Sequence, residues 1–238
     1  MKIDVFEIVI ALTAGLGLFL YGMKLMSDGL EKAAGARLRK ILEAVTKNRF
    51  LGLIVGLLFT AVVQSSSATT VLVVSFVNAG LMDLFQAAGV ILGANIGTTV
   101  TAQLIAFNLS DVAPFFLMGG VCMVMFFKQP MVKRIGEVVL GFGMLFFGMS
   151  VMSDGMASLR TDPMVQDVLS SMTNPFLAVG VGFIVTAILQ SSSATVGVVL
   201  LVASQGLIPL NICFYIILVH FIFCNKQNIT FYFLYYLF

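Results

Sequence analysis

The sequence predicts an all-α membrane protein in which two inverted repeats each carry a re-entrant helical hairpin. Three observations predict this fold: an apolar composition, a repeat at a fixed offset, and two apolar segments that are each interrupted by a polar run. The 238 residues are 60% hydrophobic, and the mean hydropathy is +1.07. Only 10% of the residues are charged, against about 25% in soluble domains. This composition favours several membrane-crossing helices.

Other classes of protein are disfavoured by the same composition. The net charge is only +2, and no basic stripe alternates with aromatic residues, which argues against a nucleic-acid partner. Cys122, Cys213 and Cys224 lie in apolar surroundings without metal-ligand spacing, so no transition-metal site is expected. His220 is the only histidine, which argues against a serine–histidine nucleophilic site. We expect neither an enzyme nor an organic cofactor.

An internal repeat runs through most of the chain at an offset of 126 residues. Residues 60–69 return as residues 186–195, and both copies contain the letters QSSSAT. The letters MSDG at 26–29 return at 152–155. Single glycines match at the same offset: Gly22 with Gly148, Gly56 with Gly182, and Gly80 with Gly206. We therefore divide the chain into a first repeat, 1–140, and a second repeat, 141–238. The second repeat is expected to be incomplete, because the offset places the equivalent of residue 140 at position 266.

Apolar runs define the remaining elements in chain order. Residues 5–26 follow Lys2 and form a first span, because no cleavage site for a removed signal follows them. Residues 27–50 are polar and basic, which predicts a separate helix at the membrane surface. Further spans are expected at 85–107, 114–127 and 138–152, and a polar, acidic segment at 153–175.

The two interrupted segments predict re-entrant hairpins at about 51–79 and 176–206. The arm at 51–63 has 13 residues, which is about 20 Å as a helix. The hydrocarbon core is about 30 Å thick, so one arm is too short to cross it. A polar hairpin tip within the membrane is tolerated only where it lines a cavity in the protein.

Charge placement indicates that the two repeats have opposite orientations. Residues 31–49 carry six basic and two acidic residues, whereas residues 153–175 of the second repeat carry Arg160 against three aspartates. The positive-inside rule places the first of these segments in the cytoplasm. Counting crossings from there, with both hairpins re-entrant, places the second segment outside. Inverted repeats with broken helices are typical of secondary transporters, whose binding site lies near the membrane midplane.

The QSSSAT runs are the candidate binding residues. A helix that begins after such a tip would offer free N–H groups and serine hydroxyls to a small oxyanion, and the hydroxyl and glutamine oxygens suit Na⁺. The runs and their apolar arms contain no Arg or Lys, so co-bound cations would supply the countercharge. Close helix packing is the alternative role of small hydroxyl residues; their repetition with glutamine at the same place favours binding.

A second polar group follows the first hairpin, in the letters GANIGTT at 93–99. Two glycines and Asn95 favour local unwinding, which would free carbonyl oxygens for a cation beside Thr98 and Thr99. The same glycines could instead form a packing face for another helix. The residues alone leave both interpretations open.

Two copies of QSSSAT, with GANIGTT after the first, resemble the type II sodium–phosphate cotransporter family in its bacterial form. The resemblance covers residues 1 to about 218. It implies a multi-pass, Na⁺-dependent phosphate symporter of the inner membrane, and it leaves a homodimer open. It also implies that the residues of the two runs bind phosphate and Na⁺, with a weaker implication of Na⁺ binding at Asn95, Thr98 and Thr99. The residues of the two runs are Gln64, Ser65, Ser66, Ser67, Thr69, Gln190, Ser191, Ser192, Ser193 and Thr195.

The resemblance and the repeat both stop near residue 218. The repeat predicts a second GANIGTT at 219–225, but the sequence there reads VHFIFCN and continues into a tail rich in Phe and Tyr. We expect that a frameshift, insertion or assembly error replaced the original C-terminus; a diverged final helix is the alternative. No soluble C-terminal domain is expected. Two other functions stay open: a Na⁺-coupled carrier for another small anion, and a transport-inactive or regulatory membrane protein.

Overall fold

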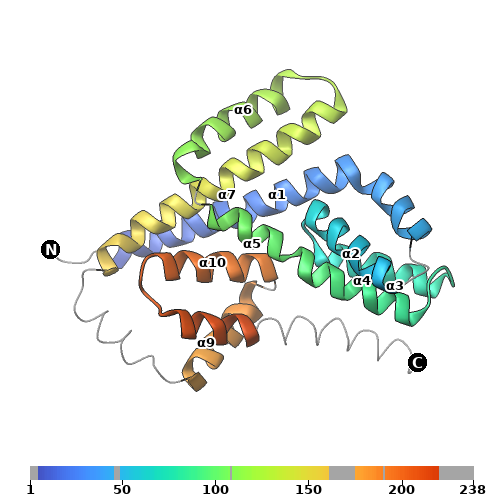
Figure 1. Cartoon of the computed structure of the whole chain (residues 1–238). Coiled ribbons are helices and arrows are strands. Elements are labelled where there is room, and N and C mark those ends of the chain that lie inside the picture. The colour runs from blue at the N-terminus through green and yellow to red at the C-terminus, as the bar shows by residue number, and fades with distance from the viewer. Residues whose placement is uncertain (1–4, 46–48, 108, 161–174, 190, 220–238) are drawn as a thin grey trace. The chain divides into compact units, whose positions relative to one another are not determined.

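The computed structural model describes residues 5–45, 49–107, 109–160, 175–189 and 191–219, and throughout these ranges the regular elements are helices (Figure 1). Three stretches are long and apolar enough to cross a membrane: Phe6–Ala33, Leu84–Ala106 and Pro130–Ala157. The prediction of an all-helical membrane protein is thus supported. Gln190, most of the predicted acidic segment and the tail from His220 lie outside the described residues.

The first long helix differs from its prediction. Helix α1 runs without interruption over Val5–Val45, whereas we predicted a span ending at Met26 and a separate surface helix. No proline interrupts these residues, and glycine serves here for close packing. A Cβ atom at Gly29 would lie 3.0 Å from the carbonyl oxygen of Arg134, on helix α7 (Pro130–Arg160).

The first predicted hairpin corresponds to helices α2 (Arg49–Val63) and α3 (Ser66–Asn78). Side chains from both helices share one core with the next helix, α4 (Leu84–Gly97). Glycines bring the backbones of α2 and α4 close together: a Cβ atom at Gly56 would lie 2.1 Å from the carbonyl oxygen of Val90. Helix α5 (Thr99–Ala106) continues from α4 after one turn residue.

Helix α6 is shorter than a membrane span. It covers Ala113–Phe126 after a 3-10 turn at Ser110–Val112, and 14 residues of helix extend about 21 Å. The predicted span at 114–127 is therefore not among the three stretches that are long enough to cross. Helix α6 packs along α7, where a Cβ atom at Gly120 would lie 2.4 Å from the backbone nitrogen of Leu140. Figure 1 shows the two helices side by side.

The second predicted hairpin corresponds to helices α9 (Pro175–Leu189) and α10 (Ser192–Ser204). An apolar helix at Leu210–Val219 follows them. Ala178, Val199 and Ile216 belong to a core that these three helices share. Each QSSSAT run therefore separates two helices that pack against each other and against the helix that follows.

The chain forms two compact units, which we describe separately. One unit contains residues 21–144, and the other contains residues 1–20 and 145–238. The first hairpin belongs to the former and the second hairpin to the latter. This division follows contacts in space, so it does not test the predicted repeat boundaries at 1–140 and 141–238.

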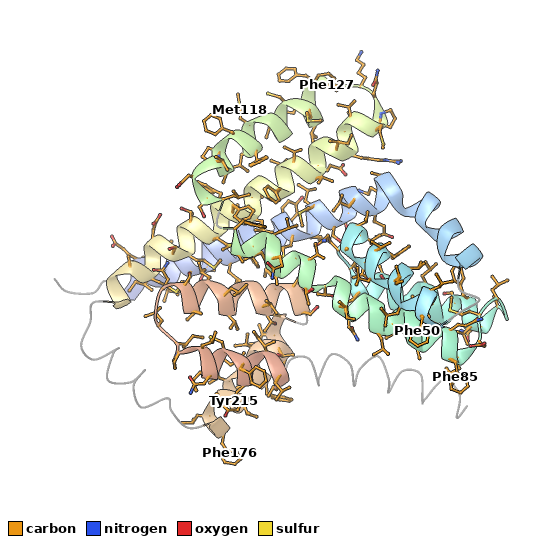
Figure 2. All side chains as sticks on the ribbon, viewed as in Figure 1. Phe50, Phe85, Met118, Phe127, Phe176 and Tyr215 are labelled. Atoms are coloured by element: carbon orange, nitrogen blue, oxygen red, sulfur yellow. The ribbon has the colours of Figure 1, made fainter. Side chains whose placement is uncertain are left out.

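Large apolar side chains cover much of the outer surface. Phe85 is 78% exposed, Met118 68% and Phe176 84%, and Figure 2 shows these three side chains pointing away from the ribbon. An apolar surface of this kind suits lipid tails, which are as apolar as the side chains themselves.

Candidate functional site

The first QSSSAT run begins with a backbone conformation that is unusual for glutamine. Helix α2 ends where the Gln64 N–H donates to the Thr60 carbonyl oxygen at 2.7 Å. Gln64 has a φ of 59°, and among the described residues it is the only non-glycine residue with a positive φ. This conformation costs a non-glycine residue about 1 kcal/mol or more, and such costs concentrate at functional sites.

The side chain of Gln64 is held at both ends. Its amide nitrogen donates to the carbonyl oxygen of Ala61, and its amide oxygen accepts from the Thr101 hydroxyl on α5. Thr101 is 2% exposed. The tip of the first hairpin is therefore attached to the segment that follows GANIGTT, and Thr101 joins the site although it was not among the predicted binding residues.

Ser65 starts helix α3 as its N-cap. Its backbone is extended, with φ −139° and ψ 102°, and its hydroxyl accepts from the Ala68 N–H at 3.2 Å. The first N–H groups of a helix have no partner within the helix, so the N–H groups of Ser66 and Ser67 stay available. The Ser66 and Ser67 hydroxyls make no hydrogen bond to another described residue. Four donors thus gather at one helix end.

Two buried threonines lie behind this helix start. Thr60 and Thr69 are 1% and 0% exposed, and their hydroxyl oxygens are 2.8 Å apart. The Thr69 hydroxyl also lies 2.9 Å from the Ser65 carbonyl oxygen, to which it donates. These bonds tie the end of α2 to the start of α3. Thr60 could have been included from the sequence, because the repeated segment begins with it.

The second run starts helix α10 in the same way. Ser191 has φ −137° and ψ 120°, and its hydroxyl accepts from the Ala194 N–H at 3.4 Å. The hydroxyls of Ser192 and Ser193 likewise have no hydrogen-bond partner within the described part of the chain. The predicted partner Gln190 lies outside the described residues. The second helix start therefore offers the same donors as the first.

The far ends of the two hairpins also match. Gly80 and Gly206 have φ values of 69° and 72°, which a residue with a side chain rarely adopts. The N–H of the following residue, Leu81 or Leu207, donates back to the helix, to Phe76 at 2.9 Å or to Val202 at 3.2 Å. This left-handed glycine turn ends a helix and explains why glycine recurs at the offset of 126.

The GANIGTT segment stays almost wholly helical. The break between α4 and α5 is limited to Thr98, which keeps helical angles. The hydroxyls of Thr98 and Thr99 donate to the carbonyl oxygens of Ala94 and Ile96, at 3.1 and 2.7 Å. Of the two interpretations left open, local unwinding is therefore limited to one residue, because the helix resumes directly after Thr98.

The packing interpretation of the same segment is supported instead. A Cβ atom at Gly93 would lie 1.9 Å from the Leu53 carbonyl oxygen, and one at Gly97 would lie 2.5 Å from that of Leu57. Asn95 is half-buried on the same helix and has an interaction partner. A sodium role for Asn95, Thr98 and Thr99 stays a prediction.

The structure thus brings together two sets of predicted residues, one at each tip. Gln64, Ser65, Ser66, Ser67 and Thr69 lie within one turn of the start of α3. Ser191, Ser192, Ser193 and Thr195 lie in the same positions on α10. The two sets belong to different compact units, and the prediction that they share one site stays a prediction.

The chain is similar in sequence to several known proteins. The chain is 32% identical over 208 residues to "Uncharacterized protein YqeW" of Bacillus subtilis (86% of this chain, 66% of the relative). It is 30% identical over 205 residues to "Putative inorganic phosphate export protein YjbB" of Escherichia coli K12 (85% and 38%). It is 39% identical over 95 residues to "Sodium-dependent phosphate transport protein 2A" of Mus musculus (39% and 15%). No solved structure matches the chain.

The chain spans less than two thirds of the length of YqeW and YjbB. One family model matches the chain twice in succession, over residues 18–154 and 147–222. The matched ranges contain both serine-tipped hairpins, and together they cover most of the chain. The chain therefore belongs to the Na⁺/Pi-cotransporter family.

Proposed function

We propose that this chain is a multi-pass protein of the inner membrane that transports inorganic phosphate together with Na⁺, and that it is not an enzyme. The observation that carries the proposal is a serine-capped helix start that occurs twice, with similar backbone angles at Ser65 and Ser191. The family and the names of two relatives support phosphate as the transported anion.

The chemistry of each helix start suits a small oxyanion. Two free N–H groups and two serine hydroxyls can donate to phosphate oxygens, and the helix end adds a partial positive charge. Neither hairpin contains a charged residue over 51–79 or 176–206. Burying an unpaired phosphate charge in such a site would be costly. Na⁺ bound beside the anion offsets this cost, which couples the two fluxes.

We also propose that the two repeats are inverted, with re-entrant hairpins whose tips share one site. The packing of α1 on α7 supports this. A Cβ atom at Gly15 would lie 2.7 Å from the Gly148 carbonyl oxygen and 2.9 Å from the Met152 nitrogen. One at Gly141 would lie 2.6 Å from the Gly22 oxygen and 2.5 Å from the Met26 nitrogen.

The offset of 126 relates these two contacts to each other. Gly15 is equivalent to Gly141, and Gly148 and Met152 are equivalent to Gly22 and Met26, so the same contact occurs twice with the roles of α1 and α7 exchanged. In each unit, α1 and α7 also run in opposite directions. Gly22 and Gly29 contact successively earlier residues of α7, Gly141 and Arg134. In the other unit, Ala11 and Gly15 likewise contact Gly155 and then the earlier Gly148. Repeats of opposite orientation that exchange the roles of α1 and α7 would show this equivalence, which supports the proposed inversion.

The transport proposal is tested by uptake of labelled phosphate in cells that lack their own phosphate carriers. We expect uptake that requires the chain and falls to background when choline replaces Na⁺. Unlabelled sulfate in excess should not compete; competition by sulfate would favour a broader anion carrier. Phosphate binding in proteoliposomes without flux would favour the transport-inactive alternative.

The direction of transport needs its own measurement, because YjbB is named for export. In a symporter, an inward Na⁺ gradient drives phosphate inward, so proteoliposomes with Na⁺ outside should accumulate phosphate. Efflux from phosphate-loaded vesicles that ignores the Na⁺ gradient would instead favour an exporter.

Inversion is tested by labelling single cysteines from one side of the membrane. Lys32 and Asp154 are exposed near equivalent ends of α1 and α7. In a background without Cys122, Cys213 and Cys224, Lys32→Cys should react with a membrane-impermeant maleimide only from the cytoplasmic side, and Asp154→Cys only from outside. Labelling of both from the same side would rule out inverted repeats.

A further inference from the structure

The repeated MSDG motif at 26–29 and 152–155 has no part in the proposed binding site, yet it connects each long helix to a hairpin. Met26 and Met152 are 4% and 3% exposed, and they contribute to the packing of α1 against α7. The next residue in each copy, Ser27 or Ser153, is half-buried and forms a hydrogen bond to the hairpin of its own repeat.

Ser27 holds the tip of the first hairpin. Its hydroxyl donates to the Val63 carbonyl oxygen at 3.0 Å. Val63 is the last residue of α2, and a carbonyl at a helix end lacks a partner within its helix. Gln64 follows at once, so this bond fixes the point from which the glutamine and the serines extend.

Ser153 holds the opposite end of the second hairpin. Its hydroxyl accepts from the side-chain amide of Gln205. Gln205 is the C-cap of α10 and precedes the turn glycine Gly206. The offset of 126 makes Ser27 and Ser153 equivalent, but it relates Val63 to Leu189 and Gln205 to Ala79. The two serines therefore hold different ends of equivalent hairpins.

The two ends are far apart along the hairpin. Helices α3 and α10 have 13 residues each, which separates the two ends by about 20 Å. The two equivalent repeats therefore differ in which end of the hairpin the serine bonds. A transporter whose repeats exchange conformations during its cycle requires such a difference. The hydrogen bonds of Ser27 and Ser153 would then mark the two end positions of one movement.

We infer that Ser27 and Ser153 are positioning residues that hold a hairpin by its tip in one state and by its base in the other, and that the two repeats exchange these states. This inference rests on the proposed Na⁺-coupled phosphate transport by two inverted repeats. In the state described here, Ser27 lies at the tip and Ser153 at the base. In the exchanged state, Ser27 lies beside Ala79 and Ser153 beside Leu189.

Disulfide cross-linking of equivalent pairs tests this inference without measuring transport. The pair Ser153→Cys/Gln205→Cys reports the present state, and Ser27→Cys/Ala79→Cys reports the exchanged state. Both are introduced into one chain in which Ala replaces Cys122, Cys213 and Cys224; position 213 is equivalent to Ala87 in the first repeat. The protein is oxidised in membranes, its remaining thiols are alkylated, and its intact mass is recorded.

We expect molecules with four alkylated thiols and molecules with two, and peptide mapping should find each disulfide in a separate population. Molecules with no alkylated thiol would carry both disulfides at once and would overturn the inference. It would also be overturned if the pair at 27 and 79, or the pair at 153 and 205, never formed a disulfide. Matched single-cysteine variants control for links between molecules.

A second measurement needs only the pair at 153 and 205, and so covers the case in which the four-cysteine chain does not fold. Ser27→Ala removes the hydrogen bond at the first tip and so destabilises the state in which Ser153 lies beside Gln205. Losing one hydrogen bond from that state should lower the yield of the 153–205 disulfide about fivefold. Ser27→Thr keeps the hydroxyl and should restore the yield. A purely structural role of Ser27 within its own repeat would leave the yield unchanged, and that result would overturn the inference.

Phosphate uptake by the unmodified chain is scored separately. Mutually exclusive disulfides in a chain without uptake would refute the symport proposal and keep the exchange of states. Na⁺-dependent uptake by a chain whose two disulfides form in the same molecule would refute the exchange and keep the symport.

Discussion

The two hairpins share their backbone and differ in their interiors. The second helix of each hairpin, α3 or α10, begins with a serine cap at similar angles and is followed by a left-handed glycine, Gly80 or Gly206. In the first hairpin the buried hydroxyl of Thr69 is bonded to Thr60 and to the Ser65 carbonyl. In the second, the equivalent hydroxyl of Thr195 is fully buried and has no hydrogen-bond partner in the described structure.

The packing of the two hairpins against the following helix differs as well. A Cβ atom at Gly56 would lie 2.1 Å from the carbonyl oxygen of Val90. At the equivalent pair, a Cβ atom at Gly182 would lie 2.9 Å from the Cα atom of Ile216. The repeated residues therefore specify the same hairpin backbone twice, while the first hairpin is packed more tightly and its threonines are more fully bonded. Duplicated sequence does not require duplicated roles.

The largest difference is expected for alanine at the two equivalent glycines. Gly56→Ala forces the backbones of α2 and α4 apart, because a carbonyl oxygen cannot move out of the way as a side chain can, and should destabilise the protein by about 3 kcal/mol. Gly182→Ala should cost about 1 kcal/mol. Thermal unfolding in detergent, followed with a thiol-reactive dye that detects exposure of the buried Cys213, measures both.

Gly119 offers a control for that comparison, since a Cβ atom there meets nothing within 4 Å. Gly119→Ala should leave the unfolding temperature within a degree or two of the parent chain. Equal destabilisation by Gly56→Ala and Gly182→Ala would show that the two hairpins are packed alike.

The serine hydroxyls should have the next largest effect. Ser66→Ala and Ser192→Ala each remove a free hydroxyl donor beside the proposed phosphate, and a hydrogen bond to a charged group contributes about 1.5–3 kcal/mol. We expect the apparent KM for phosphate to rise tenfold or more in each, with membrane insertion unchanged. Ser75→Ala is the matched control, because its hydroxyl bonds only to Val71 on an exposed surface.

Normal phosphate transport by both serine variants would exclude these tips as the substrate site. A loss of transport in only one of the two variants would show that the hairpins contribute unequally to phosphate binding. The two hairpins would then differ in binding as well as in packing.

The buried threonines should respond in opposite directions. Thr69→Val removes hydroxyl bonds to Thr60 and Ser65 and should destabilise the protein by about 1–3 kcal/mol. Thr195→Val replaces a hydroxyl without a partner by a methyl group of similar size, so in choline it should be neutral or slightly stabilising. The same thiol-dye unfolding measurement checks both.

Repeating that measurement in Na⁺ sharpens the result. If the Thr195 hydroxyl binds Na⁺, the parent chain should gain stability in Na⁺ over choline, and Thr195→Val should lose that gain. An unchanged gain in Thr195→Val would remove Thr195 from the proposed ion site.

Much of this architecture could be predicted because it is encoded locally. Only nearby residues determine the serine caps at Ser65 and Ser191 and the glycine turns at Gly80 and Gly206. Each of these patterns also occurs twice in the sequence, which makes it easier to recognise. The helix limits were less predictable. Residues 27–45 are polar yet continue α1, since polarity alone does not end a helix when no proline or capping residue interrupts it.

Features that depend on distant contacts could not be predicted. Gly93 and Gly97 suited either unwinding or packing, and only the position of α2 against them distinguishes the two. The positive φ of Gln64 had no signal, because that conformation usually selects Gly or Asn. Whether the two tips face each other depends on how whole helices assemble, and it stays a prediction.

The smaller of the two effects on phosphate transport is expected at Thr101, which attaches the first tip to α5. The equivalent position falls in the part of the chain that departs from the repeat. Thr101 donates to the Gln64 amide oxygen, whereas position 227, its equivalent, is glutamine and lies outside the described residues. Thr101→Val frees one end of the Gln64 amide and should raise the apparent KM for phosphate about threefold to tenfold, the effect of one lost hydrogen bond. Thr101→Ser keeps the hydroxyl and should behave like the parent chain. An unchanged KM in Thr101→Val would mean that the strained backbone at Gln64 holds the side chain without help from Thr101.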